Sequence, residues 1–452
     1  MDPHDRKPLL SQAADRALAY LKTLDQRPVF PSSEAIAKLT TLGGPLPEQG
    51  CDPAEVLARL DEVASPATVA MGGGRYFGFV NGGVLPVALA ANWLAAAWGQ
   101  NAALWIMSPA AVELERIALD WLAELFGLPD RCAGAVVTGA TMANFTGLAA
   151  ARHTLLEREG WDVERQGLFG APPIEVVVGD EIHVSLLKTL GMLGLGRDRV
   201  VRVPTDGQGR LIAKDIPRLS RRTILCLQAG NVNTGAFDPF EEACANAREA
   251  GAWVHVDGAF GLWASASAAR AALTRGLALA DSWATDAHKT LNSGYDCGIA
   301  FVRQTSAVSA AMNVPAPYLL DNEHRQPMHF TPESSRRARG VELWATLKSL
   351  GRSGVAEMVE RMCAHATRLA GGLRRAGHNV LNEVVFNQVL VSFGDAERTR
   401  RIIEAVQKDG TCWCGGSVWQ GHDAMRVSIS SWATTDDDID RSLAAILRAA
   451  ER

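Results

Sequence analysis

The sequence predicts an α/β fold with a doubly wound, mostly parallel sheet, followed by a smaller α+β domain. Two observations lead to this prediction. Short β-branched and apolar runs alternate with helical segments, which is typical of parallel strands joined through helices. Beyond residue 340 a long helix leads into strands and helices that no longer alternate in this way. The runs of the alternating region cover residues 135–138, 174–178, 200–203, 223–228, 252–256, 282–285 and 298–302.

Length and composition indicate a globular protein of two or three domains. The chain has 452 residues, of which 47% are hydrophobic and 21% charged. We expect an N-terminal helical segment (1–75), a large α/β domain (76–340) and a small C-terminal α+β domain (341–452). A formal net charge of −5 without a basic patch argues against nucleic-acid binding.

The remaining composition argues against a membrane, secreted or metal-binding protein. The apolar stretch 84–98 is too short and interrupted to span a bilayer, so it predicts a buried core helix. The polar N-terminus does not look like a signal peptide, and we expect a cytoplasmic protein. Cys412 and Cys414 are the one close pair among eight cysteines, and no further ligands lie nearby. We therefore expect core packing and no metal site.

Helices are predicted from periodicity and capping. In the N-terminal segment they cover residues 15–24 and 52–63, the second with Asp52 as N-cap and Pro53 at its first position. Residues 112–126 have a clear apolar stripe, and Asp238 is the expected N-cap of a helix over 239–250. The C-terminal domain is expected to have the following elements: strands over 380–393 and 424–430, and helices over 398–408 and 436–450.

A lysine and an aspartate at the ends of strand-like runs point to a cofactor. Lys289 lies in a polar turn between two such runs, and Asp257 ends the run 252–256. A buried lysine loses its charge readily, and a neutral amine adds to a carbonyl to form a Schiff base. A carboxylate can keep a pyridine nitrogen protonated, so this pair suits pyridoxal 5'-phosphate. Both residues are expected where ligands bind in such sheets, at the carboxyl ends of the strands.

A phosphate site is predicted at the junction between the strand run 135–138 and the helix after it. The turn is built of small residues, and Ala140 and Thr141 begin the helix. Free N–H groups and the positive end of the helix dipole favour a phosphate dianion at this position.

Two motifs resemble those of a known family, the group II pyridoxal-phosphate decarboxylases, which include aromatic-amino-acid and glutamate decarboxylases. The motifs are His255-Val256-Asp257-Gly258-Ala259 and Asp286-Ala287-His288-Lys289. The resemblance covers residues 76–347 and implies the fold type I architecture of aspartate aminotransferase. It also implies a homodimer with shared active sites, in which the N-terminal segment packs across the partner.

The resemblance assigns cofactor roles to further residues. His183 is expected to stack on the pyridine ring, with Ala259 against the opposite face. His288 is expected to contact the phosphate. Relatives often have a threonine-rich segment where this chain has Asn231 and Asn233, so either asparagine could contact the cofactor hydroxyl. The last contact expected is from Ser335, which would reach the phosphate of the partner subunit.

The resemblance also indicates substrate contacts. A glycine-rich loop is expected to line the substrate pocket through Phe79, Val80 and Asn81, and Trp105 is a candidate for the neighbouring subunit's site. Tyr318 is expected to protonate the product carbon. His324 and His329 are other possible proton donors. In the C-terminal domain Arg426 could bind a substrate carboxylate, but a structural ion pair is the preferred prediction for it.

The function expected is α-decarboxylation of an L-amino acid to an amine and CO2, through a Lys289 aldimine and a quinonoid. Phe79 and Trp105 favour an aromatic or large apolar substrate. Other reactions of the same cofactor stay open: aldol-type cleavage, transamination, and decarboxylation coupled to oxidative deamination. A non-catalytic protein that binds pyridoxal phosphate is the remote alternative.

Overall fold

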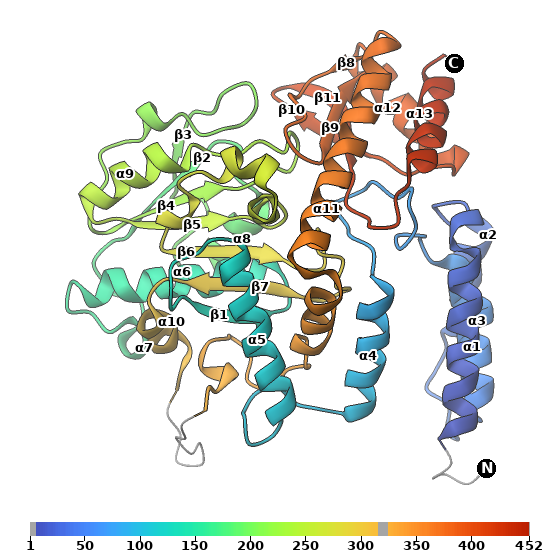
Figure 1. Ribbon diagram of the computed structural model, residues 1–452, viewed down its shortest axis with the longest axis horizontal. Coiled ribbons are helices and arrows are strands. Elements are labelled where there is room, and N and C mark those ends of the chain that lie inside the picture. Colours follow the sequence, from blue (N-terminus) through green and yellow to red (C-terminus); the bar gives the residue numbers. More distant parts are fainter. Residues whose placement is uncertain (1–5, 315–323, 452) are drawn as a thin grey trace.

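The protein was analysed as a computed structural model that describes residues 6–314 and 324–451. Its central sheet has seven strands in the order β1-β7-β6-β5-β4-β2-β3 (Figure 1). Five strands are parallel to one another, namely β6, β5, β4, β2 and β3. The strand β7 is antiparallel to both of its neighbours, β1 and β6. The strands are β1 (Ala133–Val137), β2 (Glu175–Gly179), β3 (Val201–Val203), β4 (Thr223–Gln228), β5 (Trp253–Asp257), β6 (Ser282–Asp286) and β7 (Gly298–Val302). The predicted fold class is confirmed, with each of the seven expected strands present.

Helices cover both faces of this sheet, as a doubly wound fold requires. On one face β2 and β4 pack against α6, α8 and α10. On the other face the core is completed by α5, α9 and α11. The helices are α1 (Lys7–Thr23), α2 (Ser33–Lys38), α3 (Pro53–Ala64), α4 (Pro86–Trp98), α5 (Pro109–Leu125), α6 (Ala140–Glu157), α7 (Val163–Gln166), α8 (Val184–Met192), α9 (Phe240–Ala250), α10 (Thr305–Met312), α11 (Gly340–Arg375), α12 (Ala396–Asp409) and α13 (Asp436–Ala450).

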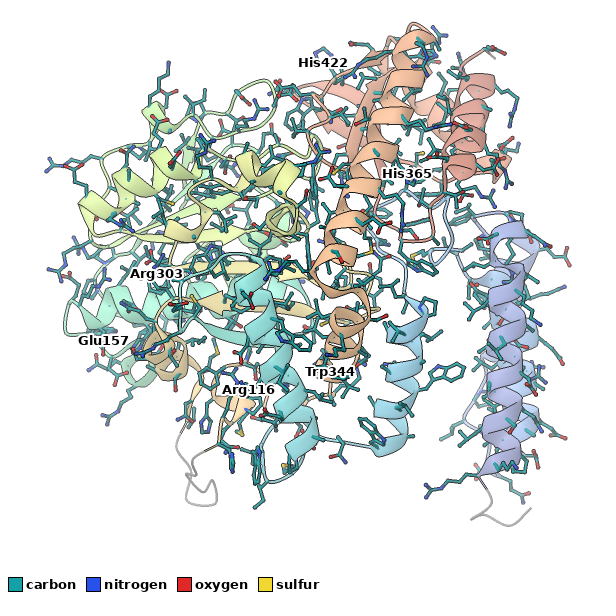
Figure 2. All side chains as sticks on the ribbon, viewed as in Figure 1. Arg116, Glu157, Arg303, Trp344, His365 and His422 are labelled. Atoms are coloured by element: carbon teal, nitrogen blue, oxygen red, sulfur yellow. The ribbon has the colours of Figure 1, made fainter. Side chains whose placement is uncertain are left out.

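A second, smaller sheet lies beyond α11 (Figure 1). Its strands are β8 (Asn379–Val380), β9 (Gln388–Ser392), β10 (Gly415–Trp419) and β11 (His422–Ser428). The first part of α11, which carries Trp344 (Figure 2), packs on α5. There Trp344 stacks on Trp121 with ring centroids 6.3 Å apart. The second part packs in the C-terminal core with α12 and α13. The division of the chain at residues 75 and 340 stays a prediction.

The two close cysteines lie in this C-terminal core. Cys412 and Cys414 are fully buried among apolar side chains, as core packing requires. Across residues 6–314 and 324–451 no cluster of three His, Cys, Asp or Glu side chains is arranged to hold a metal ion.

The N-terminal helices are unusually exposed. Neither α1 nor α3 has a buried residue, and both stand beside the body of the molecule in Figure 1. The prediction of a buried helix over 84–98 is wrong, because Trp93, Leu94 and Trp98 of α4 are 43–55% exposed. Within the described part of the chain, no helix has both the length and the apolar character that a bilayer crossing needs.

Capping was predicted correctly for α3 and wrongly for α9. Asp52 accepts a hydrogen bond from the Ala54 N–H, as an N-cap does. Asp238 instead turns inward and accepts from the N–H groups of Leu211 and Gln228, both at 2.7 Å. Backbone groups distant in sequence thus compete with the helix end for this carboxylate. The expected strand 380–393 is likewise split, into β8 and β9, and β10 was not predicted.

Candidate active site

A polar pocket opens where the parallel strands end. Gln228, Asp257 and Asp286 are the last residues of β4, β5 and β6, and all three line the pocket. Its volume is about 390 Å³. Lys289 and His183 also line it. The pocket therefore lies at the edge of the sheet where the sequence predicts the site.

Lys289 is held by a carboxylate that the sequence analysis did not single out. Its ammonium nitrogen lies 2.9 Å from Asp286 Oδ2. The other oxygen of Asp286 accepts a hydrogen bond of 2.6 Å from the Ala140 N–H, at the start of α6. One buried carboxylate thus bridges the lysine and the helix terminus predicted to bind phosphate. Thr141 follows Ala140 and also lines the pocket.

Asp257 is held in place by two hydrogen bonds. Its Oδ1 accepts from the N–H of Ala259 at 3.1 Å, and its Oδ2 accepts from the side-chain amide of Asn144 at 3.0 Å. The residue is 5% exposed and reaches solvent only through the pocket. Donation to both oxygens fixes the orientation of the carboxylate in the pocket.

The two histidines of the pocket are held neutral at physiological pH. Burial lowers the pKa of His183, and the positive charges of Lys289 and Arg426 act in the same direction, against Asp257 and Asp286. His183 Nδ1 lies 2.7 Å from the Ser185 hydroxyl, at the start of α8. Burial also lowers the pKa of His288, whose Nδ1 accepts from the Cys297 N–H.

A tyrosine that was not predicted lies over His288. The rings of Tyr295 and His288 are stacked with centroids 4.3 Å apart. The Tyr295 hydroxyl donates a hydrogen bond of 2.7 Å to Asn81 Oδ1. Burial raises the pKa of Tyr295, so its phenol stays protonated. It is the tyrosine nearest in sequence to Lys289, and this proximity was the available signal.

The glycine-rich loop reaches the pocket as expected, with Phe79, Val80 and Asn81 in its lining. Phe79 and Val80 have φ angles of 54° and 58°, a region that a β-branched residue adopts only under strain. Val80 is buried, whereas the Phe79 ring is 63% exposed and stacks on Trp413. Val80 therefore anchors the loop in the core, and the Phe79 ring stays exposed at the pocket.

Four other predicted residues do not line this pocket. Asn231 accepts from the N–H groups of Asn233 and Thr234 through Oδ1, and Asn233 Oδ1 accepts from the Ser417 hydroxyl. Exposed Ser335 accepts from the side chain of Asn101. The rings of Trp105 and His324 are stacked with centroids 3.7 Å apart. Tyr318 lies outside the described residues.

The preferred prediction for Arg426 of β11, a structural ion pair, is wrong. Among the described residues no carboxylate lies within 4.0 Å of its guanidinium, and no side chain is hydrogen-bonded to it. Burial lowers its pKa, and its charge acts on His183. The structure therefore has a largely buried cation beside the pocket whose counter-charge the described residues do not supply.

The site fits pyridoxal phosphate. Asp257 ends β5 and Lys289 lies in the turn after the adjacent parallel strand β6. Both line one pocket, so an aldehyde and a ring nitrogen of one molecule could reach them. At the other end Gly139, Ala140 and Thr141 line the pocket at the start of α6, where a phosphate would meet the helix terminus next to the Asp286 carboxylate. Asp257 could accept from a protonated ring nitrogen, and Lys289 could supply the amine that binds the aldehyde.

Comparisons with known proteins agree with this assignment. Residues 70–394 match the model of the pyridoxal-dependent decarboxylase conserved domain. An aromatic-L-amino-acid decarboxylase of Bacillus atrophaeus is 26% identical over 81% of this chain and 76% of its own length. An acidic amino acid decarboxylase of Mus musculus is 28% identical over 70% of this chain and 59% of its own length.

A solved structure shows the same fold. Oryza sativa TDC, determined with pyridoxal phosphate and tryptamine, superposes with a TM-score of 0.92 at 22% identity. The alignment covers 100% of this chain and 99% of that one. Together with the match over residues 70–394, this shows that the chain belongs to the pyridoxal-dependent decarboxylases and is an enzyme whose cofactor is pyridoxal phosphate.

Proposed function

We propose that this enzyme removes the α-carboxylate of an aromatic L-amino acid and releases CO2 and the amine. The observation that carries the proposal is the convergence of Lys289, Asp257 and His183 on one pocket beside the exposed ring of Phe79. Pyridoxal phosphate, when bound, supplies an electron sink for the bond that breaks at Cα.

The residues of the protein would bind the cofactor and the substrate and orient them. Lys289 would hold the cofactor aldehyde, and the Asp257 carboxylate would accept from the protonated ring nitrogen. His183 is neutral, so its ring can cover the cofactor without adding a charge. Arg426 supplies the charge that a substrate carboxylate requires, which fits the absence of a partner for it among the described residues.

The charge of the pocket supports a neutral substrate side chain. Apart from the two neutral histidines, the ionised groups among its described lining residues are Asp257, Asp286 and Lys289. Lys289 and Asp286 are paired with each other, and Asp257 faces the cofactor nitrogen. No further cation or anion of the lining is left for an acidic or basic side chain, whereas Phe79 offers a ring and Tyr295 with Asn81 a polar contact.

The test is a substrate screen with two readouts. Cofactor-loaded enzyme is incubated with the twenty amino acids, L-DOPA, ornithine and 2,4-diaminobutyrate, and released CO2 and product mass are measured together. The proposal expects CO2 and amine in equal amounts from an aromatic substrate, and neither from the Lys289→Ala variant. Aldehyde with CO2 would indicate oxidative deamination. Absence of CO2 from every substrate would refute the proposal, and activity confined to acidic or basic substrates would refute its aromatic part.

We also propose that the enzyme works as a homodimer. The chain exposes 21000 Å², whereas a monomer of 48.4 kDa is expected to expose roughly 17,000 Å². The excess resembles the area that an obligate dimer buries. Exposed apolar side chains on α1 and α4 support this assembly: Leu18, Leu21, Trp93, Leu94 and Trp98.

Sedimentation velocity tests the dimer. The wild type should sediment as a dimer, and Leu94→Glu should shift it toward the monomer. Phe169→Glu is the matched control, because Phe169 is also exposed but lies far along the chain from α1 and α4. A wild-type monomer at micromolar concentration would refute the assembly.

A further inference from the structure

A buried chain of hydrogen bonds ends on Asp257. It begins at the indole N–H of Trp253, which donates to the Ser282 hydroxyl oxygen at 2.9 Å. Ser282 Oγ lies 2.8 Å from His255 Nδ1, and His255 Nε2 lies 2.8 Å from Asn144 Oδ1. The Asn144 amide then donates to Asp257 Oδ2 at 3.0 Å.

The chemistry of the two ends, together with a neutral imidazole at His255, fixes the direction of every bond between them. An indole N–H can only donate, and an ionised carboxylate can only accept. Asn144 must therefore present its NH2 to Asp257 and its oxygen to His255. His255 consequently donates from Nε2 and accepts at Nδ1 from the Ser282 hydroxyl. This arrangement requires a neutral imidazole, and burial lowers the pKa of His255 to about 3.

The packing around the chain is as specific as the bonds. Asn144, His255 and Ser282 each have 0% exposure, so water does not compete for their polar groups. Asn144 and Gly147 lie three residues apart on one face of α6. A Cβ on Gly147 would approach His255 Cε1 to 2.9 Å, so the absence of a side chain there makes room for the imidazole.

We propose that Asn144, oriented by His255 and Ser282, is a positioning residue that holds the carboxylate of Asp257 aimed at the pyridine nitrogen of the cofactor. Every donor in the chain points toward the carboxylate, and such aligned bonds strengthen one another in a dry interior. Asn144 does not touch the pocket and acts only through Asp257.

The test compares two cofactors that differ only at the ring nitrogen. The dissociation constants of pyridoxal phosphate and of its 1-deaza analogue, in which carbon replaces that nitrogen, are measured by absorbance titration of the full-length apo-enzyme. Asn144→Leu should weaken pyridoxal phosphate binding about 10- to 100-fold, the range for losing a hydrogen bond to a charged group. It should leave the affinity for the analogue within about three-fold, because the analogue has no nitrogen to pair with Asp257.

Further variants separate this role from a purely structural one. Asn144→Asp keeps the size of the side chain but sets a second carboxylate beside Asp257, and it should give the same cofactor-selective loss if Asn144→Leu does not fold. Asn387→Leu is the matched control, a fully buried asparagine bonded to the Ile429 carbonyl and the Ser430 hydroxyl. It should affect both dissociation constants equally or not at all.

The outcomes are distinct. An equal loss of both affinities in the Asn144 variants would mean a structural role and overturn the proposal, as would no loss of either. Because the readout is binding, the result does not depend on which amino acid is the substrate or on whether CO2 is released.

Discussion

Gly82 joins the substrate loop to the turn that carries Lys289, and replacing it with alanine should damage both. A Cβ at this position would lie 2.1 Å from the Lys289 carbonyl oxygen and 2.5 Å from that of His288. Both contacts are with backbone, so no side chain can rotate away. The same loop is tied to the turn through the Gly83 N–H, which donates to Asn292 Oδ1 at 2.6 Å.

The magnitude follows from these distances. Ordinary contact begins at 3.4 Å, so the loop and the lysine turn must separate by about 1.3 Å. Overpacking of this kind costs about 1–3 kcal/mol of folding free energy. A displacement of about 1 Å at a reacting group lowers the rate about 100-fold. We therefore expect Gly82→Ala to fold with reduced stability and to lose about 100-fold in kcat.

The assay is CO2 release under saturating cofactor, together with a thermal melt. Gly207→Ala is the matched control, because a Cβ on exposed Gly207 would meet nothing within 4 Å. The control should keep wild-type kcat and melting temperature. Wild-type kcat in Gly82→Ala would refute the reasoning, since the substrate loop alone would then have absorbed the clash.

Three further predictions concern charged and titratable groups. Asp286→Asn keeps an acceptor for the helix terminus but removes an anion from the predicted phosphate site. The dissociation constant for pyridoxal phosphate, measured by absorbance titration, should therefore fall about ten-fold. A rise in the dissociation constant would contradict this prediction. Arg426→Gln should raise KM for the amino acid about 10- to 100-fold with a smaller effect on kcat, and an unchanged KM in steady-state kinetics would exclude carboxylate binding. His255 has a folded-state pKa of about 3, below the unfolded value of about 6.5, so below pH 6.5 the unfolded chain gains a proton that the folded chain cannot. His255 should therefore lower the free energy of unfolding by about 2 kcal/mol from pH 7 to pH 5, and urea unfolding of His255→Gln should lack this loss; equal losses in the two proteins would contradict the assignment.

Local sequence was sufficient for the strands of the large sheet and for the position of Lys289 and Asp257 at strand ends. The β-branched runs gave seven strands because buried parallel strands need continuous apolar sequence. Lys289 and Asp257 could be placed together because parallel strands end at one edge of a sheet. The small residues before α6 indicated an open helix terminus for the same local reason.

What the tertiary structure decided depends on contacts between distant segments. Asn144 and Asp257 are 113 positions apart, and no periodicity relates them. Asp286 was part of a quoted motif, yet its link to Ala140 required the packing of α6 on the sheet. The exposure of Trp93 and the lack of a partner for Arg426 among the described residues likewise depend on what lies opposite each side chain. The sequence alone thus determined the fold class and the cofactor, and it predicts Lys289 as the residue that holds the cofactor, because these follow from local pattern. The orientation of Asp257, the partner of Lys289 and the shape of the substrate pocket were decided only in the folded chain, because hydrogen bonds and burial join residues that the sequence keeps far apart.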